Sequence, residues 1–251
     1  MSFGPEMRMP QYSTRELDAL RPVLLDPDAD GPEIMYWMYR NCGRPEHAGL
    51  KEAHALRYDL TVFRPLTVGR EFLKTSGHFH PLIPGQRVSY PEVYEIVSGE
   101  ALYVMQKVED YSAAPGEIVV EDVIVARVGA GKKIVMPPGY GHVTINVSDD
   151  PLVMSNWVSD RFSSFYRVVE DMRGFAWYAV SDGGEPDFVE NTNYKQGVPQ
   201  VRWAEISEAP ELGLVWDKPL YQSCVDDPGA FEFLNDPAPF EELIWSHLLA
   251  S

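Results

Sequence analysis

The chain has 251 residues, enough for one large domain or for one domain with appendages. Apolar residues make up 45% of it and aromatic residues 12%, which supports a substantial core and excludes an intrinsically disordered protein. The formal net charge of −17 argues against nucleic acid or an anionic membrane as a partner. An anionic substrate would therefore need local basic residues to overcome this background.

Cysteine content and the N-terminus indicate the compartment. The two cysteines, Cys42 and Cys224, form neither a disulfide framework nor a metal-binding doublet, which fits a reducing cytosol. The N-terminus lacks the basic start and apolar core of a signal peptide, and no apolar run approaches the roughly 18 residues of a membrane span. We therefore expect a soluble cytoplasmic protein.

Residues 1–55 are predicted to form an N-terminal arm. Residues 13–16 read Ser-Thr-Arg-Glu, which has the form of a capping box and predicts a short helix that begins there. The aromatic segment 33–40 follows, and we interpret it as packing against the rest of the domain. An alternative is that Tyr36 or Tyr39 covers the mouth of a barrel and touches the substrate.

Residues 56–200 have the pattern of a β-barrel, because β-branched and aromatic runs alternate with turn clusters at short intervals. The predicted strands cover residues 56–64, 71–75, 93–97, 101–108, 118–120, 123–128, 133–136, 142–146, 152–158, 175–180 and 188–190. Gly- and Pro-containing turns at 98–100, 114–116, 129–131 and 182–186 predict hairpins between successive strands.

Residues 201–251 are predicted to form an acidic C-terminal extension that ends in a helix. Phe240, Leu243, Ile244 and Leu248 fall on one helical face, which should dock on the barrel or on a second subunit. We expect no catalytic role for His247 in this helix.

Four side chains between residues 75 and 146 could close on a metal ion. Residues i and i+2 of a strand share a face, so His78 and His80 would project side by side into a barrel. Glu92 on the next strand and His142 on a later one would complete a set of three nitrogens and one oxygen. This set suits Fe, Mn, Co, Ni or Zn and leaves positions for substrate or water. Without a metal these buried groups would be costly, so we predict metal binding.

The spacing of one motif resembles that of the cupins. The matching positions of their second motif are Gly131, Pro137, Gly139, His142 and Asn146. The resemblance implies an all-β fold, a cupin double-sheet β-barrel (jelly roll), with short helical N- and C-terminal extensions. In the first motif, eleven residues separate His80 from Glu92, a longer spacer than ordinary cupins have.

The same region, roughly residues 56–200, resembles more specifically the cupin-type (archaeal-type) phosphoglucose isomerases. The shared pattern is Thr75-x-Gly77-His78-x-His80, a variable spacer, Glu92-x-Tyr94, and then Pro137-Pro138-x-x-x-His142-x-x-x-Asn146. The resemblance implies a glucose-6-phosphate isomerase of glycolysis and gluconeogenesis that interconverts glucose 6-phosphate and fructose 6-phosphate. It also implies a homodimer with one divalent metal per subunit, Fe²⁺ being the leading candidate and Mn²⁺, Ni²⁺, Co²⁺ and Zn²⁺ the alternatives.

The resemblance also implies roles for single residues. His78, His80, Glu92 and His142 would bind the metal, and Glu92 would handle the proton beside carbons 1 and 2 of the sugar. Tyr94 would hydrogen-bond the sugar or the carboxylate. Interconversion of an aldose and a ketose through an enediolate needs such a base together with a Lewis acid. A hydride shift between the same carbons stays open.

For the substrate phosphate, the resemblance implies a clamp made of Thr61, Thr75, the backbone N–H of Gly77, and Tyr166. The family's histidine two residues before Tyr166 is replaced by Ser164, which leaves the phosphate geometry and the opening of the sugar ring in question. The nearby cations are interpreted as solvated surface charges. They are Arg70, Lys74 and Arg87.

Two alternatives of different classes remain. One is another cupin metalloenzyme, either a different sugar isomerase or epimerase or an iron dioxygenase, and Ser164 keeps it open. The other is a non-catalytic cupin that senses a sugar or a metal, against which the intact Glu92-x-Tyr94 argues.

Overall fold

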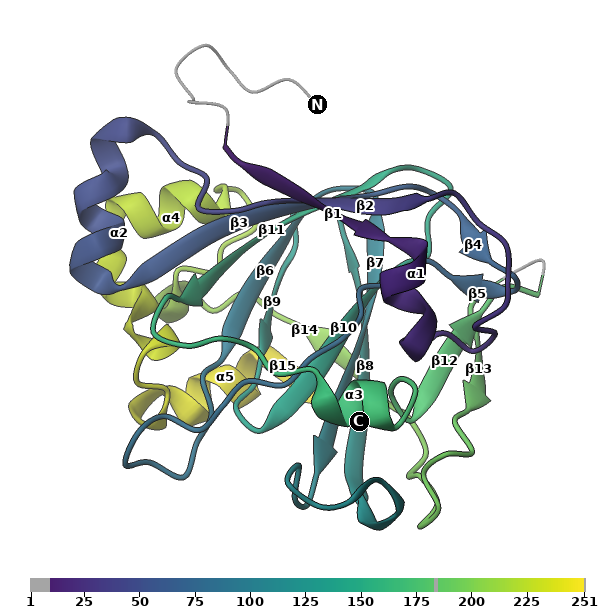
Figure 1. Ribbon diagram of the computed structural model, residues 1–251. Helices are drawn as coiled ribbons and strands as arrows, with labels where there is room; N and C mark the ends of the chain where they lie inside the picture. The colour runs from purple at the N-terminus through teal and green to yellow at the C-terminus, as the bar shows by residue number, and fades with distance from the viewer. Residues whose placement is uncertain (1–9, 183–184, 251) are drawn as a thin grey trace.

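Two sheets face each other in the computed structural model, which describes residues 10–182 and 185–250 (Figure 1). The first sheet has the order β1 (Tyr12–Glu16), β2 (Ile34–Tyr39), β3 (Leu56–Phe63), β11 (Leu152–Ser159), β6 (Glu92–Ser98) and β9 (Lys133–Met136). The second has the order β10 (Tyr140–Asn146), β7 (Glu100–Val108), β8 (Val120–Gly129), β14 (Arg202–Ile206) and β15 (Leu248–Ala250). This arrangement confirms the predicted double-sheet jelly roll.

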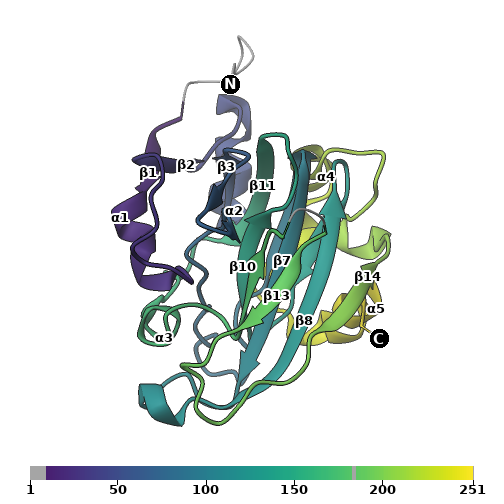
Figure 2. The same cartoon turned by 90° about the vertical axis from the view of Figure 1, so that its right-hand side faces the viewer.

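A smaller sheet flanks the two large ones at the side seen in Figure 2. Its order is β13 (Asp187–Glu190), β12 (Trp177–Val180), β5 (Glu71–Phe72) and β4 (Thr67–Val68). The paired strands of the described residues are antiparallel, except that β14 and β8 are parallel. The turn predicted at residues 182–186 lies partly outside the described residues.

Two of the predicted hairpins are sheet-to-sheet crossings instead. The chain leaves β6 in the first sheet, turns at Gly99, and enters β7 in the second sheet, while residues 129–131 carry it back from β8 to β9. Gly99 has a φ of +83°, and a Cβ there would lie 3.1 Å from the Cα of Leu152. Tight turns look alike in sequence, whereas the partner of each strand depends on contacts distant in the chain.

The short helix predicted to begin at the capping box, residues 13–16, does form, but it begins later. These residues belong to β1, which pairs with β2, and the helix α1 covers only Leu17–Leu20. Glu16 at its N-cap has an extended backbone and makes no capping hydrogen bond with its side chain. Pairing with β2 satisfies the backbone groups of this segment, and such tertiary pairing overrides a local helix signal.

The other predicted strands are observed, but several of them begin or end at different residues. The two segments predicted at 118–120 and 123–128 form the single strand β8, and the strand predicted at 71–75 is reduced to β5. The N-terminal arm and the C-terminal extension contribute β1, β2, β14 and β15 to the two main sheets. The division at residues 55 and 200 stays a prediction.

Beyond the two main sheets, the C-terminal segment covers the outer face of the first sheet (Figure 1). Its apolar residues, Leu220, Phe231 and Ile244 among them, form a second core with Val93 and Trp157 of β6 and β11. Each such side chain contributes roughly 1.5–3 kcal/mol when fully buried. The predicted docking of the terminal helix on the barrel is thus observed. The helices beyond α1 are α2 (Ala48–His54), α3 (Arg167–Asp171), α4 (Leu220–Asp226) and α5 (Glu241–His247).

None of the helices in the described parts of the chain is long and apolar enough to cross a bilayer.

His247, at the end of α5, ties the C-terminal segment to the first sheet. Its Nδ1–H donates to the carbonyl of Ser207, and its Nε2 accepts the N–H of Val135 on β9 at 3.4 Å. The side chain is fully buried, and burial lowers its pKa to about 4. His247 is therefore neutral in the folded protein and holds the segment through hydrogen bonds.

This lowered pKa predicts a pH-dependent stability. Between pH 6.5 and about 4 the unfolded chain takes up a proton on His247 and the folded one does not. Stability is lost as the pH falls through that window, by at most about 3 kcal/mol from this residue. Denaturant unfolding across the window should give a flatter profile for His247→Gln than for the wild type. Parallel profiles would contradict this role.

Candidate metal centre and substrate pocket

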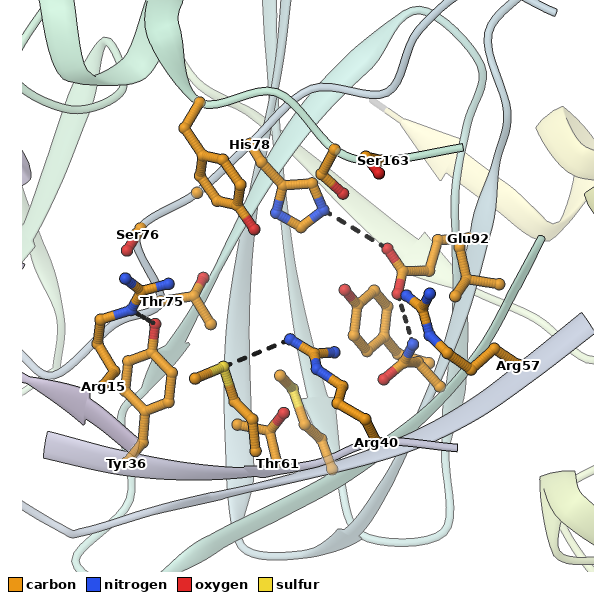
Figure 3. Close-up of a pocket in the computed structure, with 18 of the residues that line it drawn as sticks. Arg15, Tyr36, Arg40, Arg57, Thr61, Thr75, Ser76, His78, Glu92 and Ser163 are labelled. Atoms are coloured by element: carbon orange, nitrogen blue, oxygen red, sulfur yellow. Dashed lines mark hydrogen bonds and ion pairs between the residues drawn. The ribbon is translucent and has the colours of Figure 1, made fainter. Parts of the chain in front are cut away.

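The inner face of the first sheet forms the floor of a cavity of about 380 Å³ (Figure 3). Strand alternation determines which side chains reach it, because Thr61 of β3 pairs with Met38 of β2 and with Met154 of β11, and all three line the cavity. Many of the residues that line the cavity are polar or charged. The lining includes Arg15, Tyr36, Arg40, Arg57, Thr75, Ser76, Gly77, His78, Glu92, Tyr94, Asn156, Ser164 and Tyr166.

The four predicted metal ligands form one cluster, and two of them, His78 and Glu92, line this cavity. One potential ligand atom from each of His78, His80, Glu92 and His142 lies within 4.8 Å of all the others. His78 and His142 are held opposite each other by two backbone hydrogen bonds of 3.1 and 3.0 Å, and Glu92 begins β6. The four residues that were predicted as ligands from the sequence thus come from three separate segments of the chain and lie together in the structure.

The imidazoles are oriented as metal ligands. Nδ1–H of His80 donates to the carbonyl of Tyr90 at 2.9 Å, which turns its Nε2 toward the centre of the group. Nε2 of His78 lies only 3.0 Å from Nε2 of His80. Burial and the neighbouring His142 lower the pKa of His78 to about 3, so that its imidazole is neutral. Nε2 of His80 presents its lone pair toward the centre of the group, and the neutral imidazole of His78 can present one there too, so these residues fit a divalent metal.

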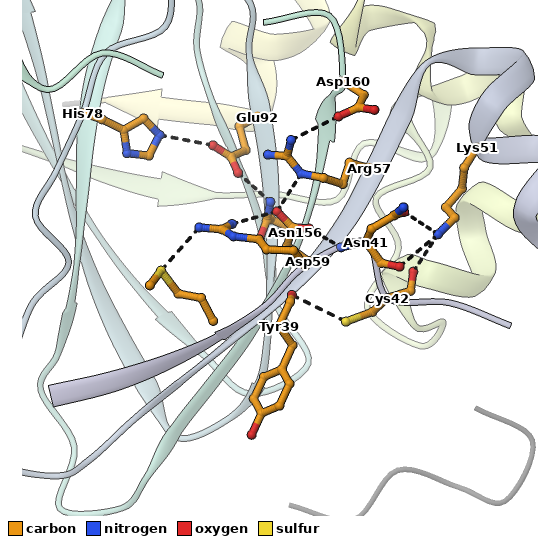
Figure 4. A network of polar contacts seen from close by, with 12 residues as sticks. Tyr39, Asn41, Cys42, Lys51, Arg57, Asp59, His78, Glu92, Asn156 and Asp160 are labelled. Carbon is orange, nitrogen blue, oxygen red and sulfur yellow. Dashed lines mark hydrogen bonds and ion pairs between the residues drawn. The ribbon is translucent and has the colours of Figure 1, made fainter. Parts of the chain in front are cut away.

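Glu92 divides its two carboxylate oxygens between different partners. Oε2 lies 3.3 Å from Nε2 of both His80 and His142 and 3.7 Å from that of His78. Oε1 accepts a hydrogen bond of 2.6 Å from the side-chain amide of Asn156 (Figure 4). Burial alone would raise the pKa of Glu92, but the hydrogen bonds of the three imidazoles lower it well below its usual value. The carboxylate is therefore ionised.

Tyr94 lies where the sequence predicted it, on the same face of β6 as Glu92. Its hydroxyl is 3.0 Å from Nε2 of His142. Burial and the charge of Glu92 raise the pKa of Tyr94. The phenol is therefore protonated and can donate a hydrogen bond.

All four residues predicted to bind a phosphate also line the cavity. Thr75 Oγ1 accepts the N–H of Thr144 at 3.0 Å, which leaves its hydroxyl hydrogen available to a ligand. Gly77 has a φ of +75°, and a Cβ there would lie 2.9 Å from the ring of Phe175, so only glycine fits. The ring of Tyr166 lies 5.5 Å from that of His78. Ser164 lines the cavity too.

The cations of the cavity were not predicted. Arg15, Arg40 and Arg57 line it, whereas the cations weighed from the sequence do not. Of those, Lys74 is buried in an ion pair with Glu71. Arg15 lies on β1, Arg57 lies on β3, and Arg40 directly follows β2. The alternation of side chains shows which of them face the cavity only once the pairing of the strands is known. Asn156 and Tyr36 were likewise not assigned to the site, although Tyr36 had been weighed as a cover for the barrel mouth.

Comparison with known proteins gives a family. Residues 15–196 match the model of the glucose-6-phosphate isomerase (GPI) family. This match covers well over half of the chain. The chain belongs to the glucose-6-phosphate isomerase family.

Individual members of this family have low sequence identity to this chain. The glucose-6-phosphate isomerase of Pyrococcus furiosus is 27% identical over 146 residues, which cover 56% of this chain and 66% of that protein. The one of Thermococcus onnurineus is 26% identical over 142 residues, 56% of this chain and 65% of that protein. The chain thus spans just under two thirds of the length of these relatives.

A solved structure of Lactobacillus farciminis oxalate decarboxylase in complex with formate is 18% identical, over 55% of this chain and 32% of that one. Its TM-score of 0.35 is too low for any inference beyond the family match.

The geometry of the centre predicts a histidine-dependent metal site. Removing the His142 imidazole should weaken the binding of Co²⁺ or Mn²⁺ by at least 10-fold, because one of three nitrogen ligands is lost. Isothermal titration of chelator-stripped wild type and His142→Gln would measure this. His54→Gln, which lies on α2 outside the four-ligand group, is the matched control and should bind like the wild type. Equal affinity in all three proteins would contradict the site.

Proposed function

We propose that this chain is a metal-dependent isomerase that interconverts glucose 6-phosphate and fructose 6-phosphate. The observation that carries the proposal is that two of the four clustered candidate metal ligands, His78 and Glu92, line one cavity together with the residues of the predicted phosphate clamp. Membership of the glucose-6-phosphate isomerase family supports it.

The reaction moves a proton between carbons 1 and 2 of the open-chain sugar. Glu92 is the base in this proposal, since its carboxylate is ionised and borders the cavity. Asn156 fixes the carboxylate through Oε1, which keeps it in one orientation during the transfer. The protonated hydroxyl of Tyr94 is a donor to the sugar or to the carboxylate.

A divalent ion bound by His78, His80, Glu92 and His142 would polarise the oxygens on carbons 1 and 2. Fe²⁺ is the leading candidate, with Mn²⁺, Ni²⁺, Co²⁺ and Zn²⁺ as alternatives, because the ligand set of three imidazoles and one carboxylate accepts each of them.

The phosphate lies at the other end of the cavity in this proposal. The hydroxyls of Thr61, Thr75 and Tyr166 and the N–H of Gly77 are neutral donors to it. Arg15 adds a positive charge on this side, since its guanidinium lies beside Thr75 and Ser76 and donates to the hydroxyl of Tyr36 at 3.2 Å (Figure 3). In a chain with a net charge of −17, this cation supplies the local attraction that an anionic substrate requires.

We further propose that the protein works in the cytoplasm, in glycolysis and gluconeogenesis, as a homodimer. The dimer is supported by β1, which among the described residues is an edge strand of the first sheet, the kind of strand that can pair with a second copy.

The decisive experiment is an isomerase assay on protein stripped with a chelator and reloaded with one metal at a time. Formation of glucose 6-phosphate from fructose 6-phosphate should vanish on stripping and return with metal. In D₂O, proton transfer through Glu92 should place solvent deuterium on the product, whereas a hydride shift would place none. Tight metal binding without isomerase activity would overturn the proposal and favour another cupin metalloenzyme or a sensor.

The phosphate clamp predicts the behaviour of Thr75→Val. Loss of a hydrogen bond to a charged group costs about 1.5–3 kcal/mol, so KM for fructose 6-phosphate should rise roughly 10- to 100-fold while the metal content stays unchanged. Thr75→Ser keeps the hydroxyl and should restore KM. Thr67→Val, on β4 outside the cavity, is the matched control. A wild-type KM in Thr75→Val would place the phosphate elsewhere.

A further inference from the structure

Asp59 is a completely buried carboxylate beside the metal centre that touches none of the proposed metal ligands (Figure 4). Its Oδ1 accepts the N–H of Asn41 at 2.8 Å. Its Oδ2 accepts from Nη1 of Arg40 at 2.7 Å and from Nε of Arg57 at 2.9 Å. A buried charge is tolerated only with such partners, and Asp59 has no exposed surface with which to reach a ligand. What it does is hold two guanidinium groups in place.

Arg57 and Arg40 differ in how far their guanidinium groups are already engaged by other side chains. Arg57 also pairs with Asp160 at 3.1 Å, so two carboxylates share its charge. Among the described residues, the Arg40 side chain makes only one further hydrogen bond, to the sulfur of Met38 at 3.4 Å, which is a weak acceptor. A guanidinium carries five N–H groups, and nearly half of the Arg40 side chain is exposed (47%). Figure 3 shows this guanidinium reaching the middle of the cavity.

The register of the strands places Arg40 nearer to Glu92 than Arg15 is. Asp59 on β3 pairs with Asn156 on β11, and Asn156 donates to Oε1 of Glu92. Arg40 and Glu92 are therefore held by two side chains that are direct neighbours in the sheet. Arg15 lies farther from Glu92, because it pairs with Tyr36, and Tyr36 pairs with Phe63, four residues along β3 from Asp59. Four residues of a strand span about 13 Å.

We propose that Arg40 is a further catalytic residue, one that contacts the substrate oxygens on carbons 1 and 2, and that Asp59 is its positioning residue. This inference rests on the proposed isomerase function. When Glu92 takes the proton from carbon 1 of the ketose, the C–H electron pair forms the double bond between carbons 1 and 2. The carbonyl oxygen on carbon 2 then gains the negative charge. To form the aldose, the hydroxyl proton on oxygen 1 passes to oxygen 2, oxygen 1 forms the new carbonyl with carbon 1, and Glu92 returns its proton to carbon 2.

N–H donors that are fixed before the reaction stabilise such a charge without reorganisation. Arg40 meets this condition because Asp59 orients it from outside the cavity. Since the charge develops only in the transition state, Arg40 should affect kcat, whereas a cation at the phosphate end should affect KM.

The test compares kcat and KM for fructose 6-phosphate in metal-loaded full-length proteins. Arg40→Gln should lower kcat roughly 100-fold and leave KM and the metal content unchanged. Arg40→Lys should recover little, because a compact ammonium cannot keep the planar contact to Asp59 and also reach the substrate. Asp59→Asn should lower kcat as well, but should add nothing in the Arg40→Gln background, since it acts through Arg40. Arg64→Gln, an exposed arginine outside the cavity, is the matched control.

The outcomes separate the two proposals. An active wild type together with a wild-type kcat in Arg40→Gln overturns the role of Arg40 and leaves the isomerase intact. A raised KM with unchanged kcat also overturns it, because Arg40 would then bind the phosphate. A wild type that is inactive with every metal removes the isomerase and with it the role of Arg40. Thermal melting of each variant shows whether it is folded, and Arg40→Gln decides the question even if Asp59→Asn does not fold.

Discussion

The burial of the Glu92 carboxylate among three imidazoles is the constraint on which the site depends. An ionised carboxylate inside a protein is stable only when its oxygens are occupied, and here Oε2 faces the imidazoles while Oε1 accepts from Asn156. The imidazoles need fixed orientations in turn, which the Tyr90 carbonyl provides for His80 and the backbone pairing with His142 provides for His78. The two-sheet fold is what brings these partners, distant in the chain, into one cluster, of which His78 and Glu92 line the cavity.

Much of this centre could be predicted from the sequence because its determinants are local. The spacing of two residues predicts that His78 and His80 share a face, although they lie outside the named strands and His78 forms only an isolated bridge with His142. The motif around His142 predicts the third nitrogen. The phosphate clamp was predicted as a set of positions, and all of them line the cavity, although their roles stay predictions. The strands with the strongest alternation were found with ends that differ by only a few residues.

What could not be predicted depends on the pairing of strands. The turn at Gly99 has the composition of a hairpin but joins two sheets, and residues 13–16 have a helix signal but pair with β2. The same limit hides Arg15, Arg40 and Arg57, because an arginine on or directly after a strand faces either solvent or the cavity, and a shift of one residue in register exchanges the two. Asn156 was missed for the same reason, since its role depends on its neighbours on β3 and β6.

Strand alternation also links the C-terminal segment to the site. On β6, Glu92 and Tyr94 face the cavity, while Val93 and Glu95 face outward, where Glu95 accepts the N–H of Leu220 at 2.9 Å. On β11, Asn156 faces the cavity, and the next residue, Trp157, is buried against the segment and donates to the carbonyl of Leu220 at 3.3 Å. The segment therefore packs against the backs of the two strands that carry Glu92 and its amide partner. Because packed layers move little, this outer layer fixes the spacing of β6 and β11, on which the bond between Asn156 and Glu92 depends.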